Sequence, residues 1–106
     1  MDNGFERVAM LWMKWAVKTF DQASSFSSLE KAGLELEELK QAVVYGIDDK
    51  VKLFEYVDVI MCLLHSAAKE GYTLKQVTEA FREKANINYN REWVLDETGN
   101  TYSHKK

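Results

Sequence analysis

The sequence contains no proline, five glycines and a single cysteine among its 106 residues. Because proline and glycine interrupt helices, their scarcity favours long helices joined by short turns. Cys62 has no second cysteine to pair with, which excludes a disulfide framework and fits a reducing compartment. No apolar run reaches the roughly 18 residues that a membrane span needs. With Asp2 and Glu6, the chain's start also lacks a signal peptide's basic segment, so we expect a soluble, cytoplasmic protein without membrane contact.

An excess of positive charge is also lacking. The formal net charge is -3 and the isoelectric point is near 5.4, so the chain carries no basic footprint for nucleic acid. A hydrophobic fraction of 46% is too high for a disordered chain. The length is close to the common size of one domain, and we predict a single domain over residues 1–106.

Helical spacing of apolar residues and capping signals predict four helices. Ser27 with Glu30 resembles a capping box, and Gly46 followed by Asp48 predicts a helix end and the next helix start. The remaining residues, 94–106, are polar and without periodicity, and form a tail that is either flexible or ordered by docking. We predict an all-α, four-helix up-down bundle with a polar C-terminal tail. The predicted helices are 6–20, 28–45, 50–70 and 74–90.

Two acidic pairs, Glu35-x-x-Glu38 and Glu55-x-x-Asp58, are the most informative feature of the chain. The second pair interrupts residues 51–64, which are apolar on nearly all sides and therefore predict a buried helix. Residues three apart project from the same side of a helix. Because unpaired buried carboxylates are costly, buried acids are paired, neutralised or bound to a metal.

A helical hairpin that bends near residue 47 would bring the two pairs to the same level. Four carboxylates without histidine or cysteine suit Mg²⁺, with Mn²⁺ as a possible substitute. Two simpler interpretations remain open at this point. In the first, Glu35 and Glu38 are ordinary surface acids. In the second, the protein is a helical binding module without catalysis, and lysine or arginine neutralises Glu55 and Asp58.

The ordered acidic pairs, followed by Lys84-x-x-x-Asn88-x-x-Arg91-x-Trp93, resemble the MazG-like all-α nucleotide pyrophosphohydrolases. The segments 15–20, 27–39 and 55–73 extend the resemblance to the dATP/dGTP pyrophosphohydrolase branch, over most of the chain from about residue 12 to residue 104. The sequence departs from many relatives at Val94, where they have proline, and this weakens what can be carried over to the tail.

The resemblance implies Mg²⁺-dependent hydrolysis of dATP and dGTP to the monophosphate and pyrophosphate. It implies that Glu35, Glu38, Glu55 and Asp58 hold the metal, and Glu38 is also our candidate for the base that orients the attacking water. Activity on dUTP, dCTP or non-standard nucleotides is the alternative within the family. Members occur as cellular pool-cleansing enzymes and in phage, so a bacterial or phage-infected cell fits.

Further candidates for substrate binding are Lys84, Asn88 and Arg91, which follow i, i+4, i+7 spacing and suit a polyphosphate chain. A solvated basic face is the simpler interpretation. Trp15 is the preferred aromatic to stack on a purine, whereas a place in the core or at a subunit interface is the alternative. The other aromatic candidates are Trp12, Phe20 and Trp93.

The helix over residues 6–20 contains more large apolar residues than one buried stripe needs. Such an excess is typical of an interface. We expect a homodimer or homotetramer, with this helix or the tail in the interface, as the resemblance also implies. His65 is interpreted as a structural or surface residue rather than a ligand, and Cys62 as a small core residue. His104, in the tail, is a weaker candidate to close over the site.

Overall fold

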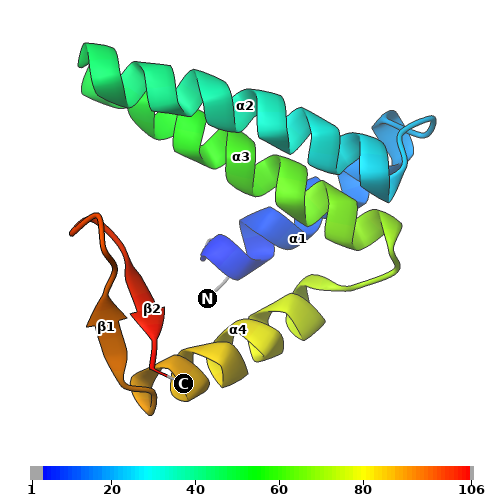
Figure 1. Ribbon diagram of the computed structural model, residues 1–106. Helices are drawn as coiled ribbons and strands as arrows, with labels where there is room; N and C mark the ends of the chain where they lie inside the picture. The colour runs from blue at the N-terminus through cyan, green and yellow to red at the C-terminus, as the bar shows by residue number, and fades with distance from the viewer. Residues whose placement is uncertain (1–3, 106) are drawn as a thin grey trace. The chain divides into compact units, whose positions relative to one another are not determined.

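The computed structural model describes residues 4–105 and contains four helices and one small sheet (Figure 1). The all-α class is confirmed, and the helix bounds lie within three residues of those predicted. No helix among the described residues is long and apolar enough to cross a membrane. The chain forms two compact units, one reaching to Leu74 and one beginning at Lys75. The elements are α1 (Phe5–Thr19), α2 (Ser25–Tyr45), α3 (Asp49–Lys69), α4 (Leu74–Tyr89), β1 (Trp93–Leu95) and β2 (Tyr102–His104).

The helices α2 and α3 form an antiparallel hairpin, side by side along their length (Figure 1). Gly46 ends α2 with φ at 64°, a left-handed conformation that glycine adopts without steric cost. Asp48 begins α3, where its carboxylate accepts a hydrogen bond from the backbone N–H of Lys50 at 3.2 Å. The predicted turn is therefore confirmed, and its short connection places the first half of α3 against the second half of α2.

The start of α2 differs from the prediction. Ser24 is the N-cap, and its hydroxyl accepts from the backbone N–H of Ser27 at 2.9 Å. The Ser27 hydroxyl lies 2.9 Å from the backbone nitrogen of Ser24 and accepts from it in return. The expected Ser27–Glu30 capping box is therefore wrong, because this reciprocal serine pair starts the helix one turn earlier.

Helix α1 packs on α3 through small and flexible residues, with Ala9, Met13 and Ala16 buried. The core of the α2–α3 hairpin adds Ala32, Leu39 and Ala42. Small side chains at these positions allow the helix backbones to approach closely.

The prediction that residues 51–64 form a buried helix is wrong for the single chain. One face of α3 packs on its neighbours, but five large residues on the opposite face are between 37% and 61% exposed. Hydropathy reports that a residue is apolar, and only packing decides whether something covers it. The exposed residues of this α3 stripe are Leu53, Tyr56, Val57, Ile60 and Leu63.

In the second unit, α4 is followed by an antiparallel hairpin in which Val94 pairs with Ser103. The tail is polar as predicted, but its residues pair with each other instead of remaining aperiodic. Asp96 organises the turn: its carboxylate accepts from the Thr98 hydroxyl at 2.6 Å and also from Thr101. The Thr98 hydrogen bond is the main reason that the pKa of Asp96 is lowered. The indole N–H of Trp93 donates to the Asn88 carbonyl at 3.0 Å, which ties β1 to the end of α4.

Candidate active site

Three carboxylates converge between α2 and α3. Glu35 comes from α2, and Glu55 and Asp58 come from one turn of α3. One oxygen from each lies within 4.8 Å of the other two. The convergence follows from the hairpin, because positions at similar distances from the Gly46 turn meet at the same level. The predicted meeting of the two acidic pairs is therefore realised by three of their four members.

The burial of Glu35 and Glu55 leaves a polar atom without a partner, whereas Asp58 is exposed. The Glu35 side chain is only 12% exposed, and Glu55 is half-buried. Glu55 Oε2 is buried and has no hydrogen-bond partner among the described residues. A buried carboxylate oxygen without a donor is destabilising, and a cation that binds there satisfies it. Oxygen donors of this kind are the ligands that hard divalent metals prefer, so the three residues fit a metal such as Mg²⁺.

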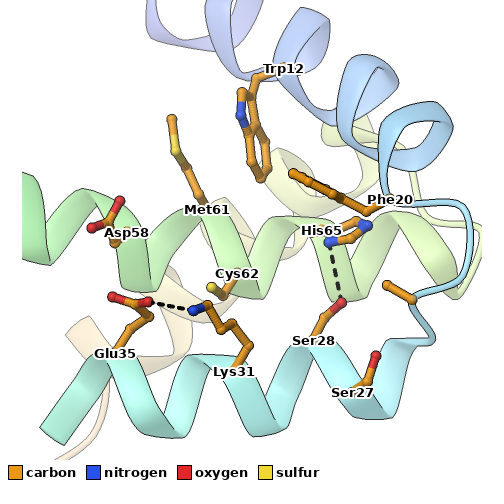
Figure 2. A pocket seen from close by; sticks show the side chains of 11 residues that line it. Trp12, Phe20, Ser27, Ser28, Lys31, Glu35, Asp58, Met61, Cys62 and His65 are labelled. Carbon is orange, nitrogen blue, oxygen red and sulfur yellow. Dashed lines mark hydrogen bonds and ion pairs between the residues drawn. The ribbon is translucent and has the colours of Figure 1, made fainter. Parts of the chain in front are cut away.

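Among residues 4–105, Lys31 supplies the positive charge that pairs with this cluster (Figure 2). Its Nζ lies 3.1 Å from Glu35 Oε1, one helical turn away on α2. The hydrogen bond and negative charge of Glu35 raise the pKa of Lys31. The ion pairs between described residues include neither Glu55 nor Asp58, so these two are not neutralised in the way that the non-catalytic alternative predicts.

Glu38 lies one turn after Glu35 and is exposed at the edge of the cluster. The negative charge of Glu35 raises the pKa of Glu38, and desolvation and the charge of Glu55 add to the effect. Glu38 is thus electrostatically coupled to the cluster although its oxygens lie outside the group of three. The role of Glu38 as the base stays a prediction.

A pocket of about 420 Å³ opens beside the acids and extends towards α1 (Figure 2). Positions Ser28, Lys31 and Glu35 line it from α2 at i, i+3, i+7 spacing, as residues on one face of a helix do. The α3 wall follows the same spacing from Asp58 to His65. The pocket therefore has an acidic end and an aromatic end. Its full lining is Trp12, Phe20, Ala23, Ser27, Ser28, Lys31, Glu35, Asp58, Met61, Cys62 and His65.

At the aromatic end, His65 Nδ1 lies 3.2 Å from the Ser28 hydroxyl. The rings of Phe20 and Trp12 lie 5.5 Å and 6.4 Å from the His65 ring, centroid to centroid. Burial lowers the pKa of His65, and the positive charge of Lys69 lowers it further, so the ring is neutral at pH 7. His65 is buried, in agreement with the structural role expected for it, but it also lines the pocket.

A family model described as dATP/dGTP pyrophosphohydrolase matches residues 9–106. The chain belongs to this family. No curated protein and no solved structure gives a significant match. The resemblance drawn from the acidic pairs and the C-terminal element is therefore confirmed, and the protein is a pyrophosphohydrolase, an enzyme that hydrolyses nucleoside triphosphates.

The other site residues predicted for this pyrophosphohydrolase lie outside the pocket lining. Trp15 is 53% exposed on α1, and its ring packs edge-on against Phe20 at 5.4 Å. Lys84 and Asn88 are on α4 in the second unit. Because α4 ends at Tyr89, Arg91 follows the helix instead of continuing its stripe. The role of each in binding substrate stays a prediction.

Ser28, Lys31 and His65 are among the pocket-lining residues that sequence reasoning missed. The sequence spacing could have identified Ser28 and Lys31, because they precede Glu35 by seven and four positions and so share its face of the helix. His65 follows Asp58 by seven positions in the same way. Nothing in the sequence showed that α1 would close the aromatic end of the pocket.

Proposed function

We propose that the protein hydrolyses dATP and dGTP to the monophosphate and pyrophosphate in a Mg²⁺-dependent reaction. The observation that carries the proposal is the convergence of Glu35, Glu55 and Asp58 at one end of an aromatic pocket. The family supports the reaction class. An acidic cluster alone binds only a cation, but a cluster beside a pocket with aromatic walls suits a metal-bound polyphosphate that carries a base.

Glu35, Glu55 and Asp58 are the proposed Mg²⁺ ligands, with Glu38 as a fourth ligand or as the base. The donor set is all oxygen, which fits Mg²⁺ and also accepts Mn²⁺. Held by these carboxylates, Mg²⁺ would supply charge neutralisation for phosphate oxygens and would acidify a nearby water molecule. We propose that Glu38, at the exposed edge of the cluster, would orient such a water and take its proton.

The shape of the pocket gives the substrate an orientation. From Asp58 to His65 the α3 wall rises through seven residues, about 10 Å along the helix axis. The phosphates belong at the acidic end, where the metal and Lys31 offset their charge. The deoxyribose would then direct the base to the aromatic end, beside Trp12. In the proposed reaction water would attack the α-phosphorus, which is the one nearest the sugar; the bond from the α-phosphorus to the bridging oxygen would break, and pyrophosphate would leave.

Lys84, Asn88 and Arg91 remain our candidates for the distal phosphates, which leave as pyrophosphate. A lysine and an arginine bind phosphate oxygens through charge-assisted hydrogen bonds, and arginine can contact two oxygens at once. Trp15 remains a candidate for stacking on the purine. Its exposed position on α1 fits a subunit interface as well, and its variant has to be tested for both.

We also propose that the protein is a homodimer or homotetramer. Val8, Leu11 and Trp15 recur at i, i+3, i+7 on α1, and all three are exposed. Together with the α3 stripe they present more apolar surface than a monomer usually leaves in water. A second copy of the chain covers such a surface with matching apolar residues. The α1 residues agree with the helix that the sequence predicts to lie in the interface.

The first experiment measures pyrophosphate release with Mg²⁺ from the four dNTPs and dUTP. The Glu55→Gln variant removes one cluster charge, and Glu37→Gln is the matched control because Glu37 pairs with Lys40 at 3.2 Å outside the cluster. Purine-selective release that is lost in Glu55→Gln and retained in Glu37→Gln supports the proposal. Release confined to dUTP or dCTP would show that the substrates are pyrimidine nucleotides. No release from any nucleotide by the folded parent protein would point to the binding module.

The oligomer is tested by sedimentation velocity. The parent is expected to sediment as a dimer or tetramer of a 12.3 kDa chain. Leu11→Glu should dissociate it, because a carboxylate in an apolar interface is desolvated. Lys40→Glu, on an exposed position of α2, is the control that should leave assembly unchanged. A parent protein that stays monomeric at working concentration would refute the proposal.

A further inference from the structure

Ser28 and His65 form a buried polar pair at the aromatic end of the pocket. His65 is 7% exposed and Ser28 is 5% exposed. They come from different helices, and their side chains meet at 3.2 Å between Ser28 Oγ and His65 Nδ1 (Figure 2). The second ring nitrogen, Nε2, is buried and has no hydrogen-bond partner among the described residues. A polar atom in this state is costly unless a ligand satisfies it.

The pair itself indicates which proton His65 carries. A neutral imidazole has one N–H donor and one acceptor nitrogen. If the Ser28 hydroxyl donates to Nδ1, only the Nε2 N–H remains unsatisfied. If instead Nδ1 carries the proton, both the Ser28 hydroxyl hydrogen and the Nε2 lone pair lack partners. The first arrangement leaves fewer buried groups unpaired, so His65 presents an N–H donor at Nε2.

The Phe20 ring lies next to the His65 ring (Figure 2). The two ring centroids are 5.5 Å apart, and Phe20 is 44% exposed at the end of α1. An exposed aromatic side chain changes rotamer on a fast timescale, so a ligand in the pocket can displace it. A planar base that enters beside Trp12 would meet the edge of the His65 ring once Phe20 turns.

We propose that His65, positioned by Ser28, selects purines by donating a hydrogen bond from Nε2 to N7 of the base. The inference rests on the proposed function and adds the means of base selection. Adenine and guanine both carry an acceptor at N7, and guanine adds O6 beside it. Pyrimidines have no N7. A site with a buried donor at this place therefore accepts both purines. When a pyrimidine binds, the buried N–H has no acceptor, and an unpaired buried donor discriminates more strongly than the loss of an apolar contact.

The test uses dATP and dGTP with their 7-deaza analogues, in which N7 is replaced by C–H. In the parent protein the analogue should lower kcat/KM about tenfold, the ratio expected for one hydrogen bond. His65→Leu removes the donor, and should process each purine and its 7-deaza analogue at equal rates. His65→Gln keeps an N–H₂ donor near the Nε2 position and should retain part of the ratio. Ser28→Ala removes the hydroxyl that holds His65 in this tautomer, and should reduce the ratio.

The ratio of kcat/KM between a purine substrate and its 7-deaza analogue separates recognition from folding, because a merely structural defect lowers kcat/KM for both substrates alike. If His65→Leu does not fold, Ser28→Ala and His65→Gln still decide the question through the same ratio. Equal rates on both members of each pair in the parent would overturn the inference while leaving the pyrophosphohydrolase intact. A tenfold ratio that persists in Ser28→Ala and His65→Leu would assign N7 recognition to another group. Failure of the parent to hydrolyse any dNTP would instead reject the proposed function.

Discussion

Replacing Glu55 by glutamine should stabilise the metal-free protein. Glu55 contributes one of three carboxylate oxygens that lie within 4.8 Å of one another, and Lys31 pairs with only Glu35. Glutamine has nearly the same shape, removes the charge, and supplies an N–H₂ donor for the neighbouring oxygens. Asparagine or alanine would shorten the side chain and add a packing defect, so glutamine is the cleaner perturbation.

Coulomb's law gives the size of the effect. Two unit charges 4.8 Å apart repel by about 1 kcal/mol in water-like surroundings and by about 3 kcal/mol at an effective dielectric constant of about 20. Glu55 is half-buried, so its repulsion lies between these limits. We expect Glu55→Gln to gain about 1–3 kcal/mol of unfolding free energy in chelator, which raises the Tm of a domain of this size by about 4 °C or more.

The assay is thermal unfolding, with EDTA and with Mg²⁺. Mg²⁺ should raise the Tm of the parent, because a ligand that binds only the folded state stabilises it by mass action, by about 2.7 kcal/mol at a hundredfold excess over Kd. In Glu55→Gln this increase should be largely lost. Glu37→Gln removes an exposed acid outside the cluster. It should change neither the unfolding free energy in EDTA nor the stabilisation by Mg²⁺ by more than about 0.5 kcal/mol. A Glu55→Gln protein that melts below the parent in EDTA, or that keeps the full Mg²⁺ response, would refute the reasoning.

Three further predictions concern single side chains. Lys31→Met removes the cation that competes for Glu35, so Mn²⁺ titrated into the variant should bind more tightly by calorimetry; weaker binding would show that Lys31 supports the site. Because burial lowers the pKa of His65 below its ordinary 6.5, the stability that the neutral ring contributes is present above pH 6.5 and lost as the pH falls below it. Urea unfolding between pH 7.5 and pH 5 should therefore show a steeper loss of unfolding free energy in the parent than in His65→Gln. If the two stabilities fall in parallel with pH, His65 is not the cause of the loss. Arg91→Lys should raise KM for the proposed substrate about tenfold with little change in folding, whereas an unchanged KM would remove Arg91 from the phosphate site.

Much of the local structure could be predicted because its causes are local. Helical spacing, the absence of proline and the glycine at position 46 determine where α2 ends and α3 begins. The capping box at Ser24 was missed because neighbouring serines offer several equivalent caps. The short strands β1 and β2 escaped prediction for a different reason: three residues are too few to show alternation, and their pairing depends on the turn that Asp96 organises.

The sequence by itself determined the acidic cluster, since spacing of three within each pair and a turn near residue 47 leave the carboxylates few other places to meet. It also determined the family, through the order and spacing of the acidic and C-terminal elements. Only the tertiary structure decided that His65 meets Ser28, 37 residues earlier. The reason is that helix periodicity defines the faces of α2 and α3, but the contents of a pocket depend on how α1 packs across them. That packing also decides which apolar residues of α3 remain exposed, which hydropathy alone does not reveal.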